Sequence, residues 1–173
     1  MKLAKGLGEF FGLDIDTNAV RVVQLSRTGT GWSLSHYGYT PVDSKITSGD
    51  SPESKRRLGE AIMTAVGQAG IKTSNVAVGL PSNKTFSTII DVPKVSEQEL
   101  KAMMKYQIDQ YIPMSLDEAE VDWVLLGESL HAQNQYEILL TSTAKSYAEE
   151  RWLILQALIL KNMQWKCSVQ EAI

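Results

Sequence analysis

The order of strand and helix patterns is the feature that most constrains the fold of this 173-residue chain. Three runs rich in β-branched and aromatic residues, 10–16, 19–26 and 32–40, come first, and turn residues separate them. They predict an antiparallel meander. A helix and a short strand follow, then a strand, a helix, two strands and a helix, and a last strand is expected over 165–169. This order predicts an α/β fold with a mixed sheet.

The first helix has clear boundary signals. Ser51 can cap its start, Pro52 suits the first helical position, and Gly70 can end it in the left-handed conformation. The apolar run at 75–80 follows and predicts a buried strand that is parallel to its neighbours.

The second helix begins with a capping box, in which Ser96 and Glu99 can satisfy each other's backbone N–H groups. Helical spacing of apolar residues continues to Pro113, which is expected to end this helix. A last helix is expected over 144–161, with Asn162 as its terminating residue.

Composition excludes several classes of protein. The 17 basic and 20 acidic residues leave a net charge of -3, which argues against a general nucleic-acid binder. The single Cys167 excludes an internal disulfide and fits a reducing compartment. The longest apolar run, 152–160, is far shorter than the roughly 20 residues that span a bilayer. Glycines and an acidic residue interrupt the apolar start of the chain, so we expect a short arm there and not a signal peptide.

Residues 11–25, FGLDIDTNAVRVVQL, resemble the first phosphate-binding hairpin of the actin-like superfamily. Such a hairpin offers backbone N–H groups to a phosphate, and an Asp at the strand end holds the water shell of the metal. The resemblance places Asp14, Asp16, Thr17 and Asn18 in this loop. The family usually has Gly at the position of Asp16, where a carboxylate would face phosphate oxygens and Gly adopts the turn more easily. We therefore expect a vestigial phosphate hairpin; the alternative is a polar turn between two strands.

A second resemblance is more specific, and it is carried by four segments: 76–81 (VAVGLP), 90–100 (IDVPKVSEQEL), 106–118 (YQIDQYIPMSLDE) and 121–127 (VDWVLLG). Together they resemble PilM, a family of actin-like cytoplasmic proteins of type IV pilus assembly that is related to FtsA. The family's acidic residue at the helix end is shifted here to Asp109. The resemblance runs from about Phe11 to Val169 and corresponds to the N-terminal half of a PilM.

This resemblance implies a fold and a domain organisation. Residues 1–83 would form part of the actin-like subdomain 1A, residues 84–163 an inserted 1C subdomain, and residues 164–173 a strand that returns to 1A. A second lobe, with the remaining nucleotide-binding elements, would continue beyond this portion in full-length relatives.

The resemblance also implies a function. PilM proteins bind the N-terminal cytoplasmic tail of the membrane protein PilN in a groove between 1A and 1C, and PilN pairs with PilO. We therefore expect a scaffold at the inner face of the bacterial inner membrane, linked indirectly to PilO and the pilus motor. The expected groove residues are Leu80, Pro81, Phe86, Tyr111, Ile112, Pro113 and Met114. Strand 85–92 could add an exposed edge for strand addition.

Several residues have a second, purely structural interpretation. The residues from Tyr111 to Met114 could simply end a packed helix, and Met103 and Met104 are core residues as often as groove residues at this spacing. Trp123 is expected in the core. The basic run 55–57 is typical of a solvated helix face, although it could also contact anionic lipid.

The sequence offers few candidates for catalysis. His36 and His131 have no neighbours at metal-ligand spacing, so no metal site is expected, and Cys167 has no adjacent base. We expect no enzyme and no cofactor here, although ATP and Mg²⁺ bind full-length relatives. The alternative is an actin-like ATPase, which would need a second lobe. A third hypothesis is a filament-forming or domain-completing subunit that associates with itself.

Overall fold

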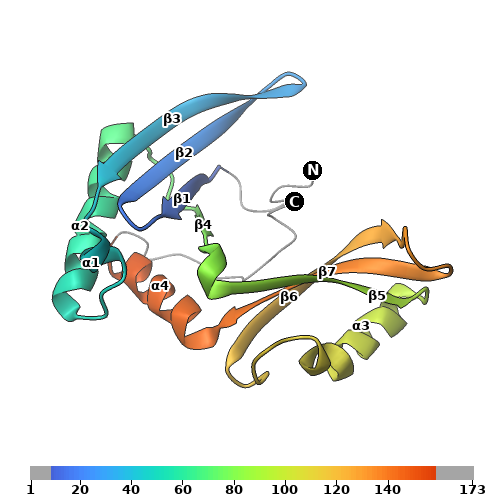
Figure 1. Ribbon diagram of the computed structural model, residues 1–173. Helices are drawn as coiled ribbons and strands as arrows, with labels where there is room; N and C mark the ends of the chain where they lie inside the picture. Colours follow the sequence, from blue (N-terminus) through green and yellow to red (C-terminus); the bar gives the residue numbers. More distant parts are fainter. Residues whose placement is uncertain (1–8, 159–173) are drawn as a thin grey trace. The chain divides into compact units, whose positions relative to one another are not determined.

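The computed structural model describes residues 9–158, shown in Figure 1. The expected strand at 165–169, Asn162 and Cys167 lie outside these residues. The described chain divides into two compact units. The first unit comprises residues 9–81 and 150–158, and the second comprises residues 82–149.

The first unit contains a four-stranded mixed sheet. Its strands are β1 (Phe11–Ile15), β2 (Ala19–Thr28), β3 (Gly31–Pro41) and β4 (Val76–Gly79), in the order β3-β2-β1-β4. The first three form the expected antiparallel meander, and β4 runs parallel to β1 as predicted. However, β4 is half-buried and not fully buried, because within the described residues it lies at the edge of the sheet.

Local side-chain chemistry defines the helices of this unit. The Ser51 hydroxyl accepts a hydrogen bond from the Ser54 backbone N–H at 3.1 Å, and α2 (Pro52–Ala69) ends at Gly70 with φ of 70°. Both predicted boundaries are therefore confirmed. The sequence did not predict the short α1 (Ser44–Thr47), which Asp43 caps. Four residues are too few to show helical periodicity.

The core of the first unit lies between the sheet and the helices. Every second residue of β1 is buried, so one face of the strand carries its apolar side chains. Gly38 of β3 allows close approach of α2, because a Cβ atom there would lie 2.4 Å from the carbonyl oxygen of Ala65. The buried centre of this core consists of Phe11, Leu13, Ile15, Val20, Val22, Leu58, Ile62, Ala65, Val66, Ile71, Ile154 and Leu155.

The second unit is a three-stranded antiparallel sheet with one long helix. Its strands are β5 (Thr85–Pro93), β6 (Ala119–Glu128) and β7 (Gln135–Ala144), in the order β5-β7-β6, and the helix is α3 (Glu97–Gln107). In the described structure β5 is an edge strand, as the sequence predicted. The buried centre of this core consists of Val92, Leu100, Met104, Ile108, Ile112, Ile138 and Leu140.

Helix α3 starts as predicted but ends earlier. The Ser96 hydroxyl accepts from the Glu99 N–H, and the Glu99 carboxylate accepts from the Ser96 N–H at 3.0 Å, so the capping box is complete. The α-helix ends at Gln107 and tightens into one 3₁₀ turn, Ile108–Gln110, several residues before Pro113. A proline disfavours helical conformation in the preceding residue, which limits how far the helix can extend.

The boundary of the second unit differs from the expected 84–163. Helix α4 (Lys145–Leu158) begins in the second unit, but from Glu150 onward it belongs to the first. Ile154 and Leu155 are buried in the first core, and Arg151 donates to the Thr47 carbonyl at 3.1 Å. Burial of these side chains therefore places the division inside α4. No helix within residues 9–158 is long and apolar enough to span a membrane.

Candidate functional site

The predicted phosphate hairpin is the turn between β1 and β2. Asp14 lies on β1, and Asp16, Thr17 and Asn18 form the turn. The backbone N–H of Thr17 donates to Asp16 Oδ1 at 2.7 Å, and the N–H of Asp16 donates to the Ala19 carbonyl at 2.9 Å. The structure thus brings the four residues together, but bonds inside the turn occupy two of the N–H groups that a phosphate would need.

Arg21 is the residue of this site that sequence reasoning missed. Its Nη1 donates to Asp14 Oδ2 at 3.0 Å and to Asp16 Oδ2 at 3.1 Å. The hydrogen bond from the Thr17 backbone and the one from Arg21 lower the pKa of Asp16, and the two carboxylates raise the pKa of Arg21. The signal that could have revealed this ion pair is the hairpin register, because Asp14 and Arg21 lie opposite each other and opposite residues of a hairpin share one face.

The turn at Asp16 does not require a glycine, contrary to the expectation from the sequence. Asn134 is the only non-glycine residue with positive φ among residues 9–158, so Asp16 does not need the left-handed conformation that favours glycine. A carboxylate at this position still carries negative charge where a phosphate would lie.

A hollow of about 520 Å³ lies next to the hairpin on the first unit. Small residues of β1 and β4, including Gly12, Ala77 and Gly79, line part of it, and Tyr37 and Tyr39 of β3 line another part. Arg21 also lines the hollow, and its guanidinium carbon lies 5.9 Å from the centre of the Tyr39 ring. The hollow is therefore mostly apolar, and Asp14 and Arg21 are the charged residues that line it.

Most of the predicted peptide-contact residues of the second unit gather around its core. Ile112 is only 8% exposed and belongs to the buried cluster, whereas Phe86, Tyr111 and Met114 are half-buried and pack against it. Pro113 is exposed. Ile112 is thus a core residue, and the other four retain accessible surface.

The other residues singled out from the sequence belong either to the first unit or to the core of the second. Leu80 and Pro81 are half-buried and belong to the first unit, so the groove that would include them remains a prediction. Met104 is 1% exposed, and Met103 and Trp123 are half-buried and pack on the same core. The core interpretation is confirmed for Met104, whereas Met103 and Trp123 line the core and keep part of their surface accessible.

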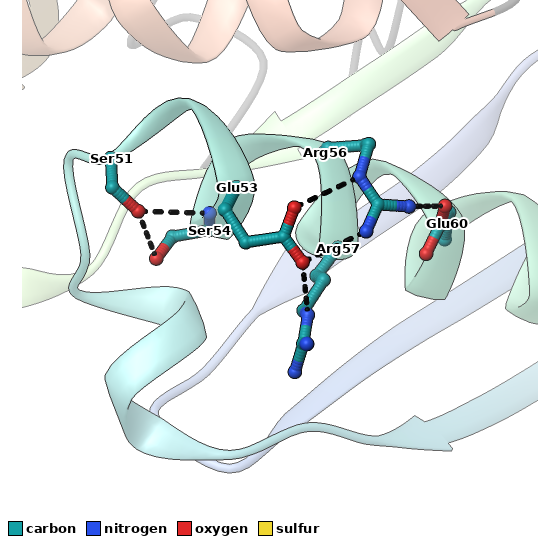
Figure 2. Close-up of polar contacts among 6 residues, drawn as sticks. All are labelled: Ser51, Glu53, Ser54, Arg56, Arg57 and Glu60. Atoms are coloured by element: carbon teal, nitrogen blue, oxygen red, sulfur yellow. Dashed lines mark hydrogen bonds and ion pairs between the residues drawn. The ribbon is translucent and has the colours of Figure 1, made fainter.

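The two arginines of the basic run on α2 are paired with carboxylates, as Figure 2 shows. Glu53 accepts hydrogen bonds from Arg56 Nη2 at 2.8 Å and from Arg57 Nε at 2.7 Å, and Arg56 also pairs with Glu60. The bonds from Arg56 and then Arg57 lower the pKa of Glu53 to about 2. Lys55 pairs with Glu150 at 3.1 Å. This pairing favours the solvated-face interpretation over contact with lipid.

The two histidines have structural or solvent-facing positions. His36 Nδ1 lies 2.7 Å from the carbonyl oxygen of Ala69, the last residue of α2, and His131 is exposed. In the described part of the chain no three His, Cys, Asp or Glu side chains form a group that could hold a metal ion.

Two solved structures are similar to this chain. One is titled "PilM-PilN type IV pilus biogenesis complex"; it matches with a TM-score of 0.72 and 19% identity over 93% of this chain and 46% of that chain. The other is the cytoplasmic domain of EpsL, an inner-membrane component of the type II secretion system of Vibrio cholerae. It matches with a TM-score of 0.49 and 12% identity over 87% of this chain and 53% of that chain. The first likeness shows a shared fold, and this chain spans about half the length of these relatives.

A family comparison covers both units of the structure. The family described as type IV pilus assembly protein PilM matches residues 12–164, which is most of the 173-residue chain. This range begins in β1 and passes through both sheets and α4. The chain therefore belongs to the PilM family of type IV pilus assembly proteins.

Proposed function

We propose that this protein is a cytoplasmic scaffold of type IV pilus assembly that binds the N-terminal tail of PilN. The observation that carries the proposal is the family match over residues 12–164, which includes both units. The similar structure of a PilM–PilN complex supports PilN as the partner, since it matches 93% of this chain.

The second unit offers a suitable binding wall for such a tail. Ile112 is anchored in the core, so the chain from Tyr111 to Met114 is held in place beyond the helical turns. Tyr111 and Met114 keep part of their apolar surface accessible, and Pro113 is exposed. Aromatic, methionine and proline side chains on a fixed backbone are typical of surfaces that bind apolar peptide residues.

The same proposal implies a location and further partners. Binding the tail of a membrane protein would hold the scaffold at the inner face of the inner membrane. It would link the scaffold indirectly to PilO and the pilus motor. Light scattering over a range of concentrations tests self-association separately.

We further propose that the described units do not catalyse a reaction and bind no nucleotide on their own. Support comes from the hairpin, where the Asp16 and Thr17 N–H groups are bonded internally and two carboxylates surround Arg21. A thermal-shift assay with ATP and Mg²⁺ tests this proposal. We expect no rise in melting temperature, and a concentration-dependent rise would favour the ATPase alternative.

Paired variants test the proposed peptide wall. Tyr111→Ala should weaken binding of a synthetic PilN tail at least about tenfold, as expected for an aromatic residue that the bound peptide covers. Tyr106→Ala is the matched control, since Tyr106 is 78% exposed on α3. Pro113→Ala provides a second variant that leaves the core intact, because Pro113 is exposed. Equal affinity of wild type, Tyr111→Ala and Pro113→Ala would exclude this wall as the site.

A further inference from the structure

The second sheet has a face that does not contribute to its core. Val92 and Ile138 point toward the α3 core, so the alternate residues of the same strands point to the opposite side. Strand register places Ile89 opposite Leu139 and Leu139 opposite Val124 on this side. We call this side of β5, β7 and β6 the outer face of the second sheet.

An apolar row crosses the outer face. Ile89 of β5 is 59% exposed, and Leu139 of β7 and Val124 of β6 are half-buried beside it. Leu126 of β6, which is 42% exposed, extends the row at the bulge near Gly127. None of these four aliphatic residues belongs to the described core clusters.

Carboxylates border this apolar row on both sides. Asp91 lies two residues after Ile89, and its cross-strand partner Glu137 lies two residues before Leu139. Asp122 is paired with Thr141, two residues after Leu139, and so lies on the other side of the row. At about 3.4 Å per residue, each carboxylate position lies roughly 7 Å along the strands from the row. On the described strands of this face the alternation places no Lys or Arg.

We propose that the outer face of the second sheet docks a basic amphipathic helix from a protein partner. Three neighbouring strands span about 10 Å, which matches the distance covered by helix positions i, i+3 or i+4, and i+7. A helix lying on the apolar row would be about 10–12 Å wide and would fit between the two acidic borders. Lys or Arg residues on both sides of its apolar stripe would then face Asp91 and Glu137 on one side and Asp122 on the other.

The charge of this face selects a protein helix over a membrane. Anionic lipid headgroups would be repelled by the same carboxylates that attract a basic helix. The proposal is also independent of PilN tail binding, because Ile112 and Met114 pack on the α3 side of the sheet.

A designed peptide can serve as the probe. The probe is a synthetic helix with a leucine stripe flanked on both sides by lysines, and a peptide of the same composition with the stripe scrambled is its control. Titration of the ¹⁵N-labelled protein should shift amide signals of β5, β6 and β7. The scrambled peptide should bind at least about fivefold more weakly, because it cannot bury a continuous apolar stripe.

Matched substitutions then test the apolar row and the carboxylates of the outer face separately. Ile89→Ser should weaken probe binding at least about fivefold, and Asp91→Lys at least about threefold. The controls are Leu116→Ser, since Leu116 is also exposed at 42%, and Asp109→Lys, which makes the same charge change after α3. Both controls should leave probe affinity unchanged.

Several results would overturn the proposal. Equal binding of the scrambled peptide, equal weakening by the two controls, or amide shifts confined to α3 would each do so. Binding to vesicles of anionic lipid that is lost in Ile89→Ser would assign the face to a membrane instead. None of these results bears on the PilN tail, since the Tyr111 and Pro113 variants test that site separately.

Discussion

Among single residues, Arg21 determines how charge is distributed at the β1–β2 hairpin. One guanidinium nitrogen lies within 3.1 Å of carboxylate oxygens from both Asp14 and Asp16. The two ion pairs are accessible to solvent, so they contribute little to the stability of the fold. Their main effect is to place one positive charge between the two carboxylates of the turn.

We predict that Arg21→Met raises the pKa of Asp16. The substitution removes one hydrogen bond and one positive charge that favour the ionised carboxylate, while the hydrogen bond from the Thr17 backbone remains. The shift should therefore be upward but partial. NMR titration of the Asp16 side-chain carboxyl measures it, with Arg27→Met on the same strand as the control. A pKa of Asp16 that is equal in wild type and Arg21→Met would contradict the assignment.

Much of this site could be predicted at the residue scale. The pattern of residues 11–25 placed Asp14, Asp16, Thr17 and Asn18 on one hairpin, and the structure confirms that arrangement. The pairing of Arg21 was not predicted, because an ion pair with two carboxylates depends on the register and on side-chain conformations. The hairpin register places Arg21 opposite Asp14, but the bond to Asp16 depends on side-chain conformation.

At the scale of elements, the capping box of α3 gives a direct test of local structure. Ser96→Ala removes the hydroxyl that accepts from the Glu99 N–H, and we expect the free energy of unfolding to fall by about 1 kcal/mol. Chemical denaturation measures this change. Gln98→Ala is the control in the same turn and should stay within about 0.5 kcal/mol of wild type. Equal stability of Ser96→Ala and wild type would show that the box does not support the helix.

Glu53, at the start of α2, makes a pH-dependent contribution to the stability of the folded protein. Arg56 and Arg57 lower the pKa of Glu53 from 4.5 to about 2, so the ionised carboxylate stabilises the folded state. This contribution is fully present above pH about 4.5 and is lost as the pH falls toward 2. The difference in melting temperature between wild type and Glu53→Gln should therefore shrink over that range. Because the group is exposed, about 1 M salt should reduce the difference as well. A difference that grows on acidification would contradict the pairing.

The predicted helix boundaries agree best with the structure where a residue acts mainly on the adjacent backbone. Ser51, Pro52 and Gly70 fixed the ends of α2, since each acts on the adjacent backbone. Two features were missed because each involves only three or four residues, too few to show a period. These are the four-residue α1 capped by Asp43, and the change from α-helix to 3₁₀ turn at Ile108.

At the scale of the whole molecule, the part of α4 from Glu150 onward belongs to the first unit. Ile154 is 8% exposed within the first core, although it follows the second unit in sequence. Ile154→Ala should destabilise the protein by about 2–5 kcal/mol, as other large-to-small core changes do. Hydrogen exchange should accelerate first in β1, β2 and α2. Acceleration confined to β5–β7 would instead support the predicted boundary at residue 163.

The sequence also predicted the larger organisation to a useful extent. The antiparallel meander of β1, β2 and β3 and the parallel pairing of β4 follow from patterns within the chain, and the PilM family follows from the resemblance; all three are confirmed. The boundary inside α4 was not predicted, because amphipathic helices look alike whichever core they pack on. The groove with Leu80 and Pro81 stays a prediction, because it depends on contacts between separate units.

Capture of the PilN tail is the central claim, and one calorimetric titration tests it most directly. A synthetic peptide of the N-terminal cytoplasmic segment of PilN from the same organism is titrated into the purified protein, with a scrambled peptide as the control. We predict saturable binding with one peptide per protein and no binding of the scrambled peptide. The absence of heat and of NMR shifts at saturating concentrations of the native peptide would contradict the claim.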